Sequence, residues 1–183
     1  MKPTAWLRLI MVLIFFAIGQ TANSGTSSSE SALKAAYLLK FAAYVEWPPS
    51  AFPDAETPLT IGVVGDDILM AELARLGANR QITKRKVLVK LMQPGERTAG
   101  VHVLFMASRD SDRLGAMLAA VNMQPILTVT QSTAGLDSGS VISFVPVDDR
   151  VRFEVSISNA ERNGLKISAL LLDVALRVRG RGP

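Results

Sequence analysis

The sequence predicts an α/β domain built as a three-layer sandwich, in which a mixed, mostly parallel sheet is flanked by helices. Three short apolar runs, 59–64, 101–106 and 125–130, are bounded by turn residues and have the length of buried strands. Amphipathic segments follow the first two runs. A C-terminal β-hairpin over 140–147 and 150–157 and a final helix complete the pattern. Strands that alternate with helices favour a largely parallel sheet covered on both faces.

The first 24 residues have the three parts of a secretory signal peptide. Lys2 and Arg8 form a positive n-region, residues 9–18 are uninterruptedly apolar, and Ala22-Asn23-Ser24 offers small residues for cleavage. A retained membrane anchor is the alternative, but a membrane span needs about 20 apolar residues and this run is half that long. We therefore expect export to the periplasm with cleavage of residues 1–24.

Beyond the signal peptide, a polar stretch over 25–31 is expected to be a flexible leader, and residues 32–179 are expected to form one domain. Without the signal peptide the chain carries 18 Lys and Arg against 16 Asp and Glu, a net charge of +2, which gives no indication of nucleic-acid binding. The sequence has no cysteine, which excludes disulfides, thiol catalysis and redox switching. With one histidine and no cysteine it offers no zinc-type site, and no cofactor is predicted.

Residues 31–45 predict the first helix, since apolar side chains recur there at helical spacing: Leu33, Tyr37, Phe41 and Tyr44. Trp47-Pro48-Pro49 ends it, because each proline disfavours the helical conformation of the residue before it. The strand over 59–64 is followed by a helix over 67–76. Gly65-Asp66-Asp67 at that junction is the position where α/β folds bind phosphates, but two carboxylates repel an anion, and helix capping is the favoured interpretation over a divalent cation site.

Residues 86–92 alternate as a half-buried strand does. A basic run lies on and before it: Arg80, Lys84, Arg85, Lys86 and Lys90. Lysines on an exposed sheet edge prevent edge-to-edge aggregation, and this interpretation is favoured over contact with anionic lipid or an acidic partner.

His102 begins the strand over 101–106. It could act as a general base, but no serine, cysteine or second histidine is placed to form a catalytic set with it, so a structural role is favoured. Ser108 or Asp110 is expected to cap the next helix.

The hairpin pairs Phe144 with Phe153 across Asp148-Asp149, a turn that aspartate tolerates. Its other face carries Arg150, Arg152 and Glu154, either as surface charges or as partner-recognition residues. Pro146 places its strand at an edge or at a bulge. After a helical turn over 159–163, the final helix is expected over 166–178.

Three stretches together carry a resemblance to a known family. They are Leu33-Lys34-Ala35-Ala36-Tyr37-Leu38-Leu39-Lys40-Phe41 running into Val45-Glu46-Trp47-Pro48, then His102-Val103-Leu104-Phe105, and finally Arg150-Val151-Arg152-Phe153-Glu154-Val155 followed by Ala160 and Gly164-Leu165-Lys166-Ile167-Ser168. In order and spacing they resemble the YfiR family over about residues 31–178.

The resemblance implies a periplasmic regulatory protein and not an enzyme. Such a protein binds the periplasmic sensor region of an inner-membrane diguanylate cyclase and holds it inactive; release raises cyclic di-GMP and promotes biofilm formation. A homodimer, an outer-membrane lipoprotein as a further partner, and a small ligand near the Trp-Pro end of the first helix are also implied. The alternative is a periplasmic small-molecule-binding sensor accessory protein without a cyclase partner.

The residues expected to bind the partner or ligand come from these stretches: Glu46, Trp47, Arg150, Arg152, Glu154, Lys166 and Ser168. Trp47 is either a core residue or an interface anchor. Glu46 stands where a basic residue would suit an anionic ligand, which disfavours a nucleotide there.

Overall fold

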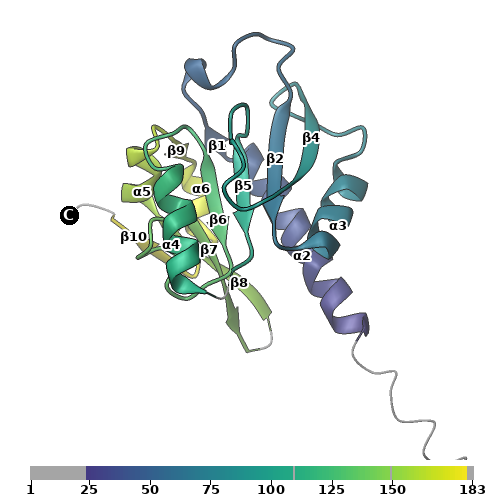
Figure 1. The fold of residues 1–183 in the computed structure, drawn as a ribbon, viewed down its shortest axis with the longest axis vertical. Coiled ribbons are helices and arrows are strands. Elements are labelled where there is room, and N and C mark those ends of the chain that lie inside the picture. The colour runs from purple at the N-terminus through teal and green to yellow at the C-terminus, as the bar shows by residue number, and fades with distance from the viewer. Residues whose placement is uncertain (1–23, 109, 149, 181–183) are drawn as a thin grey trace, which may run out of the picture.

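The computed structural model describes residues 24–108, 110–148 and 150–180, so the predicted signal peptide up to Asn23 lies outside the described residues. The helices are α2 (Ser24–Ala43), α3 (Asp67–Gly77), α4 (Ser111–Ala120), α5 (Ile157–Arg162) and α6 (Ala169–Asp173), together with a 3-10 turn, η1 (Pro49–Ala51). The strands are β1 (Val45–Glu46), β2 (Leu59–Val64), β3 (Gln81–Ile82), β4 (Arg85–Met92), β5 (Val103–Met106), β6 (Leu127–Thr130), β7 (Ile142–Val147), β8 (Arg150–Ser156), β9 (Lys166–Ile167) and β10 (Arg177–Arg179). Figure 1 shows a central sheet between helices on its two faces, which confirms the predicted fold class.

In the described part of the chain the main sheet has eight strands in the order β10-β8-β7-β6-β5-β2-β4-β3. Its centre is parallel, from β4 through β2, β5 and β6 to β7, while β7–β8 and β3–β4 pair antiparallel. Phe144 lies opposite Phe153, as the hairpin pattern predicts. A second, two-stranded sheet joins β1 to β9.

The larger core lies on the sheet face that α2 and α3 cover. Alternate residues of each strand point into it, since successive side chains of a strand face opposite ways. At its centre four aromatic rings pack together: Tyr37, Phe41, Phe144 and Phe153, with ring centroids 4.8–6.0 Å apart. Helix α2 is therefore fixed on the sheet by Tyr37 and Phe41, whereas Leu33 and Tyr44 at the two ends of the predicted stripe are exposed.

The opposite face carries a smaller core under α4, formed by Leu104 and Met106 of β5 with Leu114 and Leu118 of the helix. Asp110 caps α4 by accepting hydrogen bonds from the backbone N–H groups of Asp112 and Arg113, so Asp110 and not Ser108 is the cap. None of the helices in the described ranges has the length and apolar character of a membrane span.

The first helix starts earlier than the sequence pattern indicates. Helix α2 begins at Ser24, so the segment 25–31, expected to be a flexible leader, is helical. Glu30 and Lys34 form an i,i+4 ion pair of 2.5 Å, and Lys34 also donates a 2.9 Å hydrogen bond to Gln131. These contacts, together with the burial of Ser31, extend the helix beyond the stripe of large apolar residues that the prediction used.

The prediction of one final helix over 166–178 is wrong. The segment contains β9, the five-residue helix α6 and β10. Lys166 and Ile167 are extended because they pair with β1, and the Ser168 hydroxyl then caps α6 by accepting from the Leu170 N–H at 3.3 Å. After α6 the chain turns back and adds β10 parallel to β8, which supplies backbone partners along that edge.

Pro146 does not mark an edge strand, because β7 lies between β6 and β8. The pairing of β7 with β6 extends only over Ile142 and Ser143, whereas its pairing with β8 continues to Val147. Pro146 therefore lies where β7 has passed the end of β6, and its missing N–H breaks no ladder on that side.

Candidate functional site

The β1–β9 ribbon brings together four of the seven predicted site residues. Glu46 is the cross-strand partner of Lys166, and both side chains are exposed. Ser168 follows directly, and its N–H donates a 2.9 Å hydrogen bond to the Tyr44 carbonyl. Trp47 follows β1. Segments far apart in the sequence thus form one surface at the end of the first helix.

Trp47 is packed against the core, one of the two roles that the sequence left open. Its ring is half-buried and packs against the larger core, with the Phe52 ring at 6.2 Å and the His102 ring at 6.5 Å, both nearly perpendicular to it. The indole Nε1 is buried and has no hydrogen-bond partner among the described residues. The residue is therefore held rigidly beside the ribbon.

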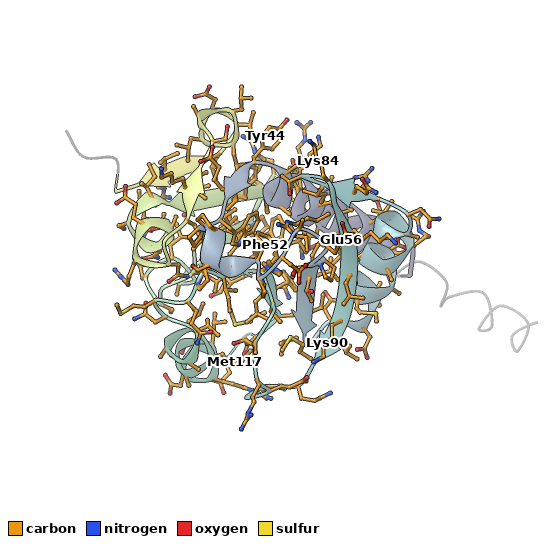
Figure 2. All side chains as sticks on the ribbon, turned by 90° about the horizontal axis from the view of Figure 1, so that it is seen from above. Tyr44, Phe52, Glu56, Lys84, Lys90 and Met117 are labelled. Atoms are coloured by element: carbon orange, nitrogen blue, oxygen red, sulfur yellow. The ribbon has the colours of Figure 1, made fainter. Side chains whose placement is uncertain are left out.

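Below Trp47, the loop between η1 and β2 is held by a stack of three side chains. The Phe52 ring lies on the His102 ring, with centroids 4.2 Å apart and an interplanar angle of 9°, and the Arg85 guanidinium covers its other side at 3.9 Å. Arg85 Nη1 also donates to the carbonyls of Asp54, Ala55 and Thr57 at 2.8–3.0 Å. Figure 2 looks down on this end of the molecule, with Phe52 and Glu56 in the loop and Tyr44 beside the C-terminal segment.

His102 has the structural role that the sequence favoured. Nδ1 accepts the backbone N–H of Thr60 at 3.1 Å, so the proton resides on Nε2, which donates to the Ala51 carbonyl at 3.0 Å. Burial lowers the pKa of His102, the Ala51 hydrogen bond opposes this shift, and the nearby Arg85 charge lowers the pKa further. Both ring nitrogens are engaged by backbone, which leaves neither free to transfer a proton.

The three hairpin residues of the predicted site do not join the ribbon. Arg150 and Arg152 lie toward the β7–β8 turn, whereas β9 follows the other end of β8 by way of α5. Arg150 and Ser156 lie six positions apart on the extended strand β8, which corresponds to roughly 20 Å. The predicted site residues therefore fall into two separate regions.

Glu154 is not the exposed charge that the sequence pattern indicates. Its side chain is 7% exposed and pairs with Arg177 of β10 at 3.0 Å, not with Arg152. Phe153 and Val155 face the larger core as predicted, but Glu154 on the other face is also buried, beside the neighbouring strand β10. Glu154 is consequently a buried structural residue, and Arg152 is half-buried.

The other charged motifs have structural explanations. Asp66 accepts the Leu69 N–H at 2.9 Å and caps α3, as expected. In the basic run, Arg85 holds the η1–β2 loop and Lys90 pairs with Glu96 at 2.5 Å, while Lys84 and Lys86 are exposed at the β3–β4 edge. Among the described residues no three His, Cys, Asp or Glu side chains gather as a metal site.

An exposed apolar patch next to the ribbon was not predicted as a site. It consists of Tyr44, Leu170 and Val174, which are 39–65% exposed. Leu170 and Val174 are four residues apart and lie on one side of α6, and the Tyr44 carbonyl binds Ser168 at the start of that helix. The sequence predicts Leu170 and Val174 as apolar positions of one long final helix, and it does not indicate that α6 is short and leaves them exposed.

Comparison with known proteins gives one match that covers most of the chain. A search of curated proteins found no relative. The family model described as YfiR/HmsC-like matches residues 31–176, a range that contains most of α2, every strand from β1 to β9, and the helices α3 to α6. The stretches that carried the resemblance lie within this range, and the chain belongs to the YfiR/HmsC-like family.

Proposed function

We propose that this protein is a periplasmic regulatory binding protein that represses an inner-membrane diguanylate cyclase by binding its periplasmic region. Binding lowers cyclic di-GMP and biofilm formation. The family match over residues 31–176 is the observation that carries this proposal. It supports a regulatory role in place of a catalytic one, and it accords with a histidine whose two nitrogens are bound to backbone.

The surface that fits a protein partner best is the β1–β9 ribbon together with the apolar patch. Apolar side chains gathered on the surface and bordered by charged groups are typical of interaction sites. Here Tyr44, Leu170 and Val174 are exposed beside the Glu46–Lys166 pair. Trp47 gives this surface a rigid base, since its ring is packed against the core.

The same surface would serve the proposed homodimer, an outer-membrane lipoprotein or a cyclase. A symmetric dimer uses one patch on both subunits, so a partner that binds there would compete with the second copy. This competition would provide a means of release. Light scattering of the mature protein, alone and with the partner's periplasmic region, measures whether the partner displaces the second copy.

Affinity capture with the mature protein from detergent-solubilised inner membranes tests the function. We expect a membrane protein with a diguanylate cyclase output domain to be retained, and Leu170→Glu to abolish its retention. Ile68→Glu is the matched control, because Ile68 is also an exposed apolar helix residue, 52% exposed on α3 against 65% for Leu170. If both variants and the wild type retain no cyclase, the small-molecule sensor without a cyclase partner becomes the better hypothesis.

Export is tested separately. The signal-peptide pattern leads us to expect mature protein in the periplasmic fraction with an N-terminus near residue 25. N-terminal sequencing of that fraction measures this, and an intact Met1 in the membrane fraction would contradict it.

A further inference from the structure

A cavity of about 620 Å³ lies on the α4 side of the sheet, and none of the ribbon residues lines it. Its floor is formed by residues of the central strands, Val64 at the end of β2 and Leu104 and Met106 of β5. Helix α4 forms one wall, and Met92 with the loop after β4 forms the other. Figure 2 shows Met117 of α4 and Lys90 of β4 along this side of the molecule.

The cavity exists because one helix covers only part of this face. The residues of α4 that line it include Arg113, Ala116, Met117 and Ala120, which recur at i, i+3, i+4 and i+7 and so lie on one side of the helix. Two of these are alanines, where larger side chains would fill the space. Methionine side chains on both walls adapt to ligands of different shape.

The charges at the rim favour an anion. Glu96 is the one acidic residue in the lining, and it is neutralised by Lys90 at 2.5 Å and accepts the Gln93 N–H at 3.0 Å. Arg97 and Arg113 also line the cavity, and neither forms an ion pair among the described residues. The rim therefore presents two guanidinium groups beside an apolar interior.

We propose that this cavity binds a small amphiphilic carboxylate, with its apolar body on Val64, Leu104 and Met106 and its carboxylate at Arg97 and Arg113. The volume lies within the range of about 300–1,000 Å³ that small-molecule sites occupy. Guanidinium groups are well suited to bind a carboxylate. The proposal concerns a second site and does not depend on the regulatory role or on the ribbon surface.

Calorimetric titration of the mature protein with hexanoate, octanoate and decanoate, all below their micellar concentrations, tests the apolar part. We expect one saturable site per chain whose affinity rises about fourfold for each added methylene. Ala116→Leu/Ala120→Leu fills the cavity and should weaken decanoate at least about tenfold. Ala119→Leu, an exposed position of α4 outside the cavity, is the matched control and should bind as the wild type does.

The charge part is tested by comparing decanoate with decanol. Arg97→Gln/Arg113→Gln should weaken decanoate at least about tenfold and leave decanol unchanged, because only the carboxylate loses its charged hydrogen bonds. Arg80→Gln, an exposed arginine outside the lining, should change neither. Melting temperatures confirm that each variant is folded. Absence of saturable decanoate binding, or equal binding by the filled and wild-type proteins, overturns the proposal, as does equal loss of decanol and decanoate affinity in the double arginine variant.

Discussion

The imidazole of His102 joins three parts of the chain that would otherwise be separate. It binds the Ala51 carbonyl in η1 and the Thr60 N–H in β2, and it supports the Phe52 ring of the intervening loop. The Thr60 contact requires an unprotonated Nδ1, so the neutral ring carries its proton on Nε2. His102, the candidate general base of the sequence, therefore has the structural role of holding the η1–β2 loop next to Trp47.

The lowered pKa of His102 predicts that the stability of the protein depends on pH. The pKa of His102 is lowered in the folded protein, so between that value and the ordinary 6.5 the unfolded chain binds more protons than the folded one. The free energy of unfolding should be at its full value above about pH 6.5 and fall as the pH drops below it. Urea unfolding from pH 5.5 to 7.5 measures this, and His102 is the sole histidine in the sequence.

His102→Phe is the control for that measurement. It should lower the free energy of unfolding by about 1–3 kcal/mol at pH 7.5, because the Thr60 N–H and the Ala51 carbonyl lose their partner. It should also remove the dependence between pH 5.5 and 6.5. An unchanged slope in this variant would show that His102 is not its source.

Gly135 gives a second prediction at this scale, since a methyl group there would collide with Thr130 Oγ1 and lie 2.8 Å from Ser143 Oγ. Those hydroxyls bind each other at 3.0 Å in a buried cluster and have little room to move. We expect Gly135→Ala to destabilise the protein by about 1–3 kcal/mol. Gly115→Ala, in α4 with open space around it, should instead stabilise by about 0.5–1 kcal/mol. Urea unfolding compares the two, and equal effects would contradict the assignment.

At the scale of elements, β10 provides the charged partner of a buried residue of β8, because it places Arg177 next to Glu154. Arg177→Ala should lower the free energy of unfolding by about 1–3 kcal/mol, because the buried Glu154 carboxylate loses the cation that faces it. Arg150→Ala, at the exposed start of the same strand pair, should change stability by less than about 0.5 kcal/mol. Thermal unfolding of both variants at pH 7 measures the difference. Equal melting temperatures would mean that the Arg177 ion pair contributes nothing.

The sequence pattern predicted the central strands and α3 to within two residues, because each is a periodic or continuous apolar run with turn residues at its ends. It did not predict β1, β3, β9 and β10, which are two or three residues long and have no period of their own. The prediction of one long final helix was wrong for a similar reason. Leu170, Leu171 and Val174 have helical spacing, but the pairing of Ile167 with Val45 makes the start of this segment a strand. Similarly, nothing near Glu154 in the sequence indicates that Arg177 lies beside it.

At the scale of the whole molecule, the two regions that contain predicted site residues can be separated by experiment. Leu170→Glu changes the surface next to the ribbon, and Arg152→Glu changes the hairpin. We expect Leu170→Glu to raise cyclic di-GMP and surface attachment in cells with little change in melting temperature, because Leu170 is 65% exposed. Arg152→Glu should leave cyclic di-GMP at the wild-type level.

Cyclic di-GMP and the melting temperature are measured together in both variants and in Phe153→Ala. That core variant should lose about 3–5 kcal/mol and with it all function. The opposite result for the two surface variants would place the switch on the hairpin. It would also show that the half-buried Arg152 binds the partner despite its distance from the ribbon.

The β1–β9 ribbon has a consequence for how the protein matures. Val45 and Ile167 lie near opposite ends of the matched family range, and contacts between such distant residues form late, since closing a long loop costs chain entropy. The surface that carries Glu46, Lys166 and α6 therefore forms only after the whole chain has been exported and has folded. A chain that is cut short or partly unfolded has no such surface. On the proposed function, a partner would therefore meet only fully folded molecules, so that folding itself acts as quality control on the binding surface.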